Sequence, residues 1–224
     1  MKHAFAQALL VLFLLVACPG TAWAQGNEPR PLEVELDTTQ VQDKPELVAW
    51  GESARDLMIE WHPRLVNMLP TKDFETLYEV RLVIQNSNEG VAYAQGNRIV
   101  VSSHWIESHP EDIGLVIHEL VHIVQHYRGR TPSWVTEGIA DYLRWAIYEG
   151  KPQRWFRRPN EERGYRQGYR VTAGFFLWLE ADKAPGIVVR LNTAARQRRY
   201  NDDIFEEVTG QTLDELWDEY RARQ

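Results

Sequence analysis

The feature that most constrains this chain is the decapeptide Ile117–His126, which contains the pattern H-E-x-x-H within an apolar run. Because an α-helix has about 3.6 residues per turn, His118 and His122 lie on one helix face and can reach the same metal ion. Glu119 projects about 100° around the helix and can hold a water bound to that ion. Imidazole nitrogens suit zinc, and a catalytic zinc keeps one position for water. A chance match is the alternative, and the residues that follow argue against it.

A zinc site needs at least one more protein ligand than these two histidines. The pattern H-E-x-x-H-x-x-G-x-x-H would supply a third histidine, but Gln125 and Arg128 occupy its glycine and histidine positions. An arginine is cationic and cannot bind zinc, so this arrangement is excluded. His126 lies one turn beyond His122, but three histidines along a straight helix extend too far to converge on a small ion. We therefore interpret His126 as a supporting or cleft-wall residue, with a ligand role as the alternative.

A second helix, predicted from Thr131 to about Gly150, offers a better ligand. It begins with a capping-type threonine and a proline suited to a first helical turn. Glu137 and Asp141 are four residues apart and share a face. We interpret Glu137 as the third ligand and Asp141 as the acceptor of the free N–H of a ligating histidine. Gly138 is small enough for the two helices to pack closely. The alternative is a solvated acidic face on a surface helix.

Four segments resemble a known family. They are Gly90–Tyr93 with Gly96–Ile99, Glu137–Tyr142 after the H-E-x-x-H helix, Gly168–Ala173, and Val208–Gly210 with Leu213–Trp217. Together they resemble the plant basic secretory protein family, a group of peptidase-like proteins of plants and bacteria, over roughly residues 45–222. The resemblance implies a gluzincin-type zinc metallopeptidase fold with two His and one Glu as ligands. Arg170 departs from the family's Gly-Tyr-Asp-x-Thr-Ala pattern, because it replaces the acid, so any role of that carboxylate is absent or reversed here.

Residues 1–24 have the features of a secretion signal. A basic start precedes the apolar stretch Ala4–Ala17, and Ala22–Ala24 is a small-x-small cleavage site. The apolar run is too short to favour a spanning helix, so we expect no transmembrane span after its removal. The alternative is a lipoprotein attachment site at Cys18, the only cysteine. Either way we expect an exported protein, periplasmic or extracellular.

The net charge of −7 over 224 residues argues against general nucleic-acid binding. We expect residues 25–45 to be an extended lead-in and residues 46–224 to form a single domain. The expected partner is a peptide or protein substrate, and the sequence leaves the oligomeric state open.

Hydrophobic periodicity predicts an α+β fold with a small N-terminal mixed sheet and a mainly helical C-terminal half, and the resemblance implies that this fold is zincin-like. The expected elements are a helix over 46–69, a strand over 78–84, a hairpin of 91–93 and 99–102, a metal-binding helix over 110–127, and helices over 131–150, 171–183, 186–198 and 212–222. The resemblance places the hairpin at the sheet edge above the zinc, where a strand can bind a peptide through its main chain. A purely structural hairpin is the alternative.

Residues 155–167 are rich in arginine with aromatic neighbours. They form either a cleft wall that recognises acidic groups or a solvated loop. Tyr165 and Tyr169 follow four residues apart, and a tyrosine hydroxyl can stabilise the anionic intermediate of peptide hydrolysis. We favour Tyr169 because it lies in the family-like segment, with a structural tyrosine as the alternative.

The leading hypothesis is an exported zinc metallopeptidase in which His118, His122 and Glu137 hold Zn²⁺ and Glu119 is the general base. The rival is a non-catalytic protein that binds cell-wall sugar or peptide on the same fold, because fold does not fix function. A purely structural zinc is a weaker reading, because it leaves Glu119 without a role.

Overall fold

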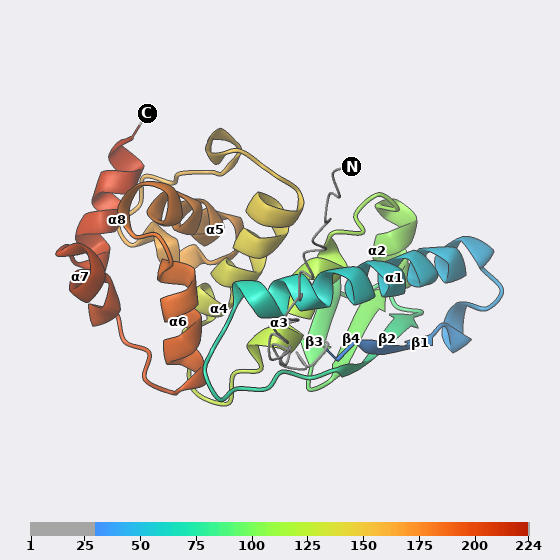
Figure 1. Cartoon of the computed structure of the whole chain (residues 1–224). Coiled ribbons are helices and arrows are strands. Elements are labelled where there is room, and N and C mark those ends of the chain that lie inside the picture. The colour runs from blue at the N-terminus through green and yellow to red at the C-terminus, as the bar shows by residue number, and fades with distance from the viewer. Residues whose placement is uncertain (1–29, 224) are drawn as a thin grey trace, which may run out of the picture.

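The computed structural model describes residues 30–223. The predicted signal peptide, its cleavage site after Ala24 and Cys18 lie outside the described residues. Figure 1 shows the sheet with α1, α2 and α3 in one half of the molecule and α4–α8 in the other, and α3 and α4 meet at the boundary between the halves. Among the described residues, no helix combines the length and the apolar character needed to cross a membrane.

The sheet has four strands in the order β1-β2-β4-β3. The strands are β1 (Glu33–Asp37), β2 (Glu79–Gln85), β3 (Ala92–Gln95) and β4 (Arg98–Ser102). β1 and β4 both pair in parallel with β2, and β3 pairs antiparallel with β4. The sheet is therefore mixed, with the predicted hairpin at one edge. Gly96 has φ +61°, a left-handed conformation that costs glycine little, and it makes the hairpin turn.

The predicted lead-in requires a correction, because its residues 33–37 form strand β1. The backbone pairs with β2 in a register that sets Leu36 opposite Leu82. Polar and apolar residues alternate along β1, which is typical of an edge strand with one face toward the core. The folded domain therefore begins before residue 46.

Helix α1 (Pro45–Met68) covers the sheet, as Figure 1 shows. Its buried residues recur every three or four positions, as expected for an amphipathic helix: Leu47, Trp50, Gly51, Ala54, Met58, His62 and Leu65. A Cβ on Gly51 would lie 3.1 Å from a methyl of Leu36 and 3.3 Å from Ile84. The helix therefore approaches the sheet closely at this glycine.

The helix predicted to bind metal is shorter than expected. α3 spans Leu115–Gln125, and a short helix α2 (Ser103–Ser108) that the periodicity did not reveal precedes it. Residues 110–114 form turns instead of a first helical turn. Asp112, expected at the helix N-terminus, accepts a hydrogen bond from Trp105 at 3.0 Å and pairs with Arg144. A tertiary ion pair thus holds Asp112 where the predicted helix would have its first turn.

The C-terminal half is helical, as predicted. α4 (Ser133–Asp141) continues as a π-helical segment, Tyr142–Tyr148, and α5 (Tyr169–Trp178) continues as another, Leu179–Lys183; α6 (Ile187–Arg196), α7 (Asp203–Thr209) and α8 (Leu213–Ala222) follow. Helix α7 was not predicted, because it is short and acidic. The core here is aromatic, with Phe175, Trp178, Trp217 and Tyr220 packed together.

Candidate metal centre

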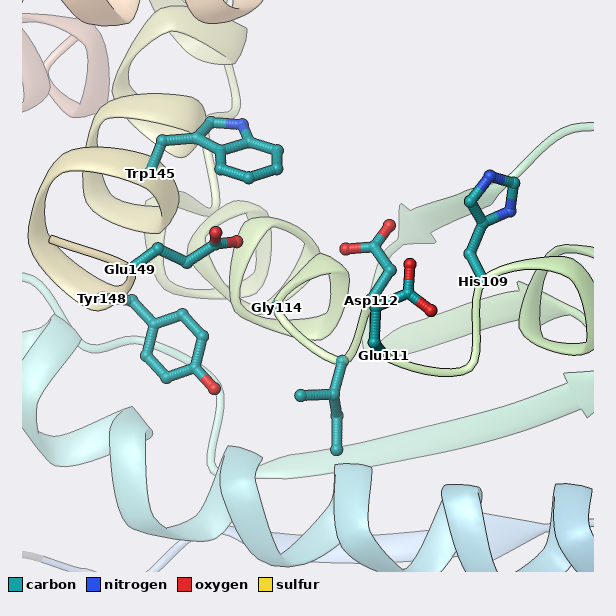
Figure 2. Close-up of a pocket in the computed structure, with 8 residues that line it drawn as sticks. His109, Glu111, Asp112, Gly114, Trp145, Tyr148 and Glu149 are labelled. Atoms are coloured by element: carbon teal, nitrogen blue, oxygen red, sulfur yellow. The ribbon is translucent and has the colours of Figure 1, made fainter. Parts of the chain in front are cut away.

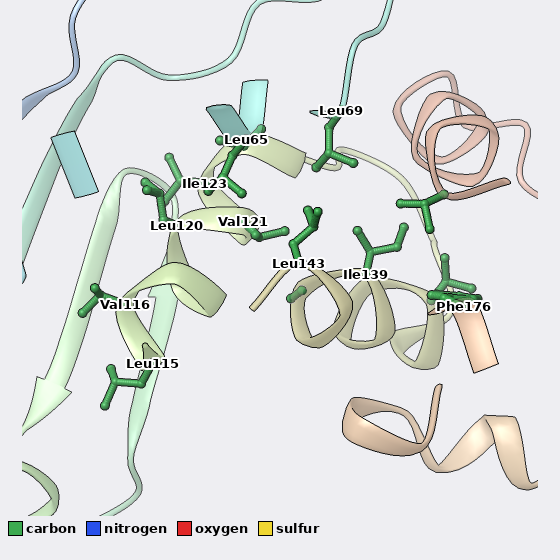
Figure 3. Packing of buried hydrophobic residues seen from close by; sticks show 14 of the residues in the cluster. Leu65, Leu69, Leu115, Val116, Leu120, Val121, Ile123, Ile139, Leu143 and Phe176 are labelled. Atoms are coloured by element: carbon green, nitrogen blue, oxygen red, sulfur yellow. The ribbon is translucent and has the colours of Figure 1, made fainter. Parts of the chain in front are cut away.

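Helix α3 is fixed by apolar contacts on the sides that do not carry the histidines. Figure 3 shows Leu120 and Ile123 near Leu65 of α1, and Val121 beside Leu143, which follows α4. All of these side chains are buried. A close-packed helix cannot rotate without losing these contacts. The packing therefore fixes the direction in which the remaining face of α3 points.

That face carries His118 and His122, and α4 brings Glu137 against them. The Nε2 atoms of the two histidines are 3.1 Å apart. The Glu137 Oε2 atom lies 3.1 Å from Nε2 of His118 and 3.4 Å from Nε2 of His122. Three ligands held about 2.0–2.1 Å from one tetrahedral zinc would be separated by roughly 3.3 Å. The group therefore has the dimensions of a metal site, and these three residues could bind a metal ion.

The hydrogen bonds on the outer side of each ring show which nitrogen is free. His118 Nδ1 lies 2.7 Å from Oδ1 of Asp141, a carboxylate that can only accept, so Nδ1 carries a proton. His122 Nδ1 lies 2.9 Å from Oε1 of Gln125, whose amide nitrogen donates to the Thr136 carbonyl. Both Nε2 atoms can therefore present lone pairs toward the carboxylate of Glu137. Three acceptors facing one another favour a cation between them, which fits the proposed metal.

The hydrogen bonds within this cluster shift the pKa values of both His118 and Glu137. Burial alone would lower the pKa of His118, but hydrogen bonds with Asp141 and Glu137 raise it to about 9. Burial opposes ionisation of Glu137 as well, yet the two histidines hold the pKa of its carboxyl down at about 2. Both shifts express a preference for positive charge at the point where the three donor atoms meet.

Glu119 lies beside this cluster, on the wall of a cavity of about 590 Å³ that also borders His118, Asp141 and Tyr169. Its carboxylate makes no hydrogen bond with the described residues, and only 8% of the residue is exposed. Burial raises its pKa, although His118 and His122 oppose that shift. A carboxylate with a raised pKa and free oxygens is suited to accept and return a proton.

The two tyrosines considered from the sequence differ in position. Tyr165 is buried, and its hydroxyl donates to Asp214 at 2.7 Å, so it supports the fold. Tyr169 is 56% exposed, and its ring lies nearly parallel to that of His118, with centroids 6.3 Å apart. Its φ of +48° is unusual for an aromatic residue and carries backbone strain. Of the two, only Tyr169 borders the cavity.

His126 and Gln125 both follow His122 in the chain, but only Gln125 contacts the metal cluster. His126 ends α3 in a left-handed conformation and bonds to Arg128, outside the metal cluster. Gln125 was not predicted to have a role, because it was noted only as the residue at the glycine position of the longer histidine pattern. In the structure it hydrogen-bonds to His122. Its spacing of three residues after His122 is a signal that could have identified it, because residues i and i+3 on a helix are neighbours.

Gly138 packs against a different helix from the one predicted. A Cβ on Gly138 would lie 2.4 Å from Cγ2 of Thr172 and 3.0 Å from Phe176, so its free surface faces α5. The glycine therefore permits close packing of α4 on α5 and not of α4 on α3. This packing sets the position of the preceding residue, Glu137.

A family model described as peptidase of plants and bacteria matches residues 60–220. The chain belongs to this family. The match spans β2–β4, α3, α4 and α5, and so includes every member of the metal cluster. Searches of curated proteins and of solved structures found no match to the chain. Family membership agrees with the resemblance drawn from the motifs, and the family's name indicates a peptidase-like protein.

Proposed function

We propose that the protein is an exported zinc-dependent metallopeptidase with a zincin-like fold of the gluzincin type. The observation that carries the proposal is the convergence of two Nε2 atoms and one carboxylate oxygen beside a buried, unbonded Glu119. A structural zinc would explain the first three groups but not the fourth. The family's name supports the same reading.

In this mechanism His118, His122 and Glu137 would hold the zinc. A bound zinc would polarise the scissile carbonyl and lower the pKa of the attacking water. Glu119 accepts the proton of that water and delivers it to the nitrogen of the leaving amine. Asp141 and Gln125 keep the two imidazoles in the tautomer that binds metal.

Tyr169 is our candidate for the residue that stabilises the anionic intermediate. The charge of Glu137 and partial burial raise the pKa of its phenol, so the hydroxyl stays protonated and can donate. Strand β3 lies at the sheet edge with one side unpaired among the described strands. A peptide added along β3 through main-chain hydrogen bonds would pass beside α3.

The test combines metal analysis with peptide-library digestion of the wild type and of Glu119→Gln. We expect about one zinc per chain in both proteins and a loss of hydrolysis of about 10²- to 10⁴-fold in the variant. Glu52→Gln is the control, because Glu52 is exposed on α1. Full activity in Glu119→Gln would contradict the mechanism. A zinc-loaded wild type that cleaves no peptide would instead favour the non-catalytic binding protein.

A further inference from the structure

A smaller cavity of about 370 Å³ adjoins the cavity of the metal centre. It is lined by Trp155, Arg157 and Gln167 together with the first residues of α5. Tyr169 and Arg170 line both cavities. A ligand that reaches the metal centre can therefore extend past these two residues into the smaller cavity.

The smaller cavity carries unpaired positive charge. Arg157 and Arg170 are both exposed, and neither forms an ion pair or a side-chain hydrogen bond with a described residue. The guanidinium of Arg170 lies 5.8 Å from the ring centre of Trp145 and 5.8 Å from that of Trp155. These two indoles pack together at 4.9 Å. Arg170 is therefore held against an aromatic support while its donors remain available.

The amino end of α5 reaches the same cavity. Gly168 caps this helix without a side chain that could bond to its first N–H groups. The positive end of the helix adds to the field of the two arginines, because the helix dipole favours negative charge there.

A third cavity shares Asp112 and Trp145 with the cavity of the metal centre, and its charge differs from that of the cavity beside α5. Figure 2 shows Glu111, Asp112 and Glu149 around this cavity, which has a volume of about 450 Å³. Asp112 and Glu149 both pair with Arg144, and Glu149 also pairs with Lys151. Its charges are thus largely matched within the protein, whereas those of the cavity beside α5 are not.

We propose that Arg170, together with Arg157, binds a carboxylate of the peptide substrate while the scissile bond lies at the metal centre. The proposal rests on the peptidase function above and adds to it a preference for acidic substrates. The carboxylate is either an acidic side chain or the C-terminus of the peptide. A partly exposed charged pair of this kind gives a preference of about tenfold.

The experiment measures peptide binding to the Glu119→Gln protein, in which peptides are bound but not cleaved. The probes are capped alanine-based peptides with one glutamate at successive positions, each with a glutamine twin, and one alanine peptide with a free C-terminus. Dissociation constants come from titration calorimetry at low salt. We expect one glutamate peptide, or the uncapped peptide, to bind about tenfold tighter than its neutral twin, with the difference reduced at high salt.

Substitutions at position 170 assign that difference to the arginine. Arg170→Gln in the same background should abolish it, and Arg170→Asp should reverse it in favour of lysine peptides. Arg190→Gln is the control, because Arg190 is exposed on α6 and does not line the cavity. The zinc content should not change in any of these variants, which excludes an effect through the metal ligands.

The outcomes separate this inference from the peptidase proposal. A preference limited to the uncapped peptide assigns the carboxylate to the chain end, and one for an internal glutamate assigns it to a side chain. Equal binding of charged and neutral twins, or a preference that survives Arg170→Gln, overturns the subsite even if the wild type cleaves peptides. A glutamate preference without any cleavage by the wild type would support the subsite and contradict the peptidase.

Discussion

The two halves of the molecule contribute to the candidate metal centre by different means. The sheet half provides His118, Glu119 and His122 from one helix, so their relative positions follow from helical spacing alone. The helical half provides Glu137 and Asp141 from α4 and Tyr169 from α5, and their positions depend on how these helices pack. The comparison teaches that a ligand set can be half local and half tertiary, and that the tertiary half should be sensitive to changes remote from the metal.

The largest expected effect tests whether the halves contribute equally. His118→Ala and Glu137→Ala each remove one of the three proposed ligands, and each should weaken zinc binding by more than about 100-fold. Competition with a chromophoric chelator measures the affinity. His126→Asn is the control, because His126 lies outside the cluster and asparagine tolerates its left-handed backbone. Near-normal affinity in Glu137→Ala would break the comparison, since α4 would then supply no ligand.

The next effect compares the outer hydrogen bonds of the two histidines. Asp141 reaches His118 from the helical half, whereas Gln125 reaches His122 from the same helix. Asp141→Asn should lower zinc affinity by about 10- to 100-fold, and Gln125→Ala should lower it less, because a neutral acceptor stabilises a bound imidazole less. Thermal unfolding of the metal-free variants separates affinity from stability. An equal loss in both would show that charge is unimportant there.

The smallest effect concerns packing away from the metal. Gly138→Ala should destabilise the protein by about 1–3 kcal/mol, because its Cβ would overlap Cγ2 of Thr172. Thr172→Ser removes that methyl but keeps the hydroxyl that donates to the Tyr165 carbonyl, so the double variant should recover part of the loss. Denaturant unfolding gives the free energies. No loss in Gly138→Ala would mean that α4 can move away from α5 at little cost.

Local patterns determined much of the fold. Alternation and periodicity predicted β2, the hairpin, α1, α4 and most of α5, α6 and α8, because each has a regular apolar face. They failed where a tertiary contact replaced a local one. Residues 33–37 form a strand because they pair with β2. Asp112 lies outside α3, where it pairs with Arg144. No pattern within a short window contains such partners.

For the candidate metal centre, the sequence alone determined the relative positions of His118, Glu119 and His122. All three lie on one α-helix, whose rise and rotation per residue are constant. The tertiary structure decided that Glu137 Oε2 lies 3.1 Å from His118, that Gln125 holds His122, and that Arg170 reaches the same cavity. These distances depend on the packing of α3, α4 and α5, and packing depends on residues far apart in the chain. Gly138 illustrates this dependence, because the side chains that it packs against belong to α5 and not to its own helix.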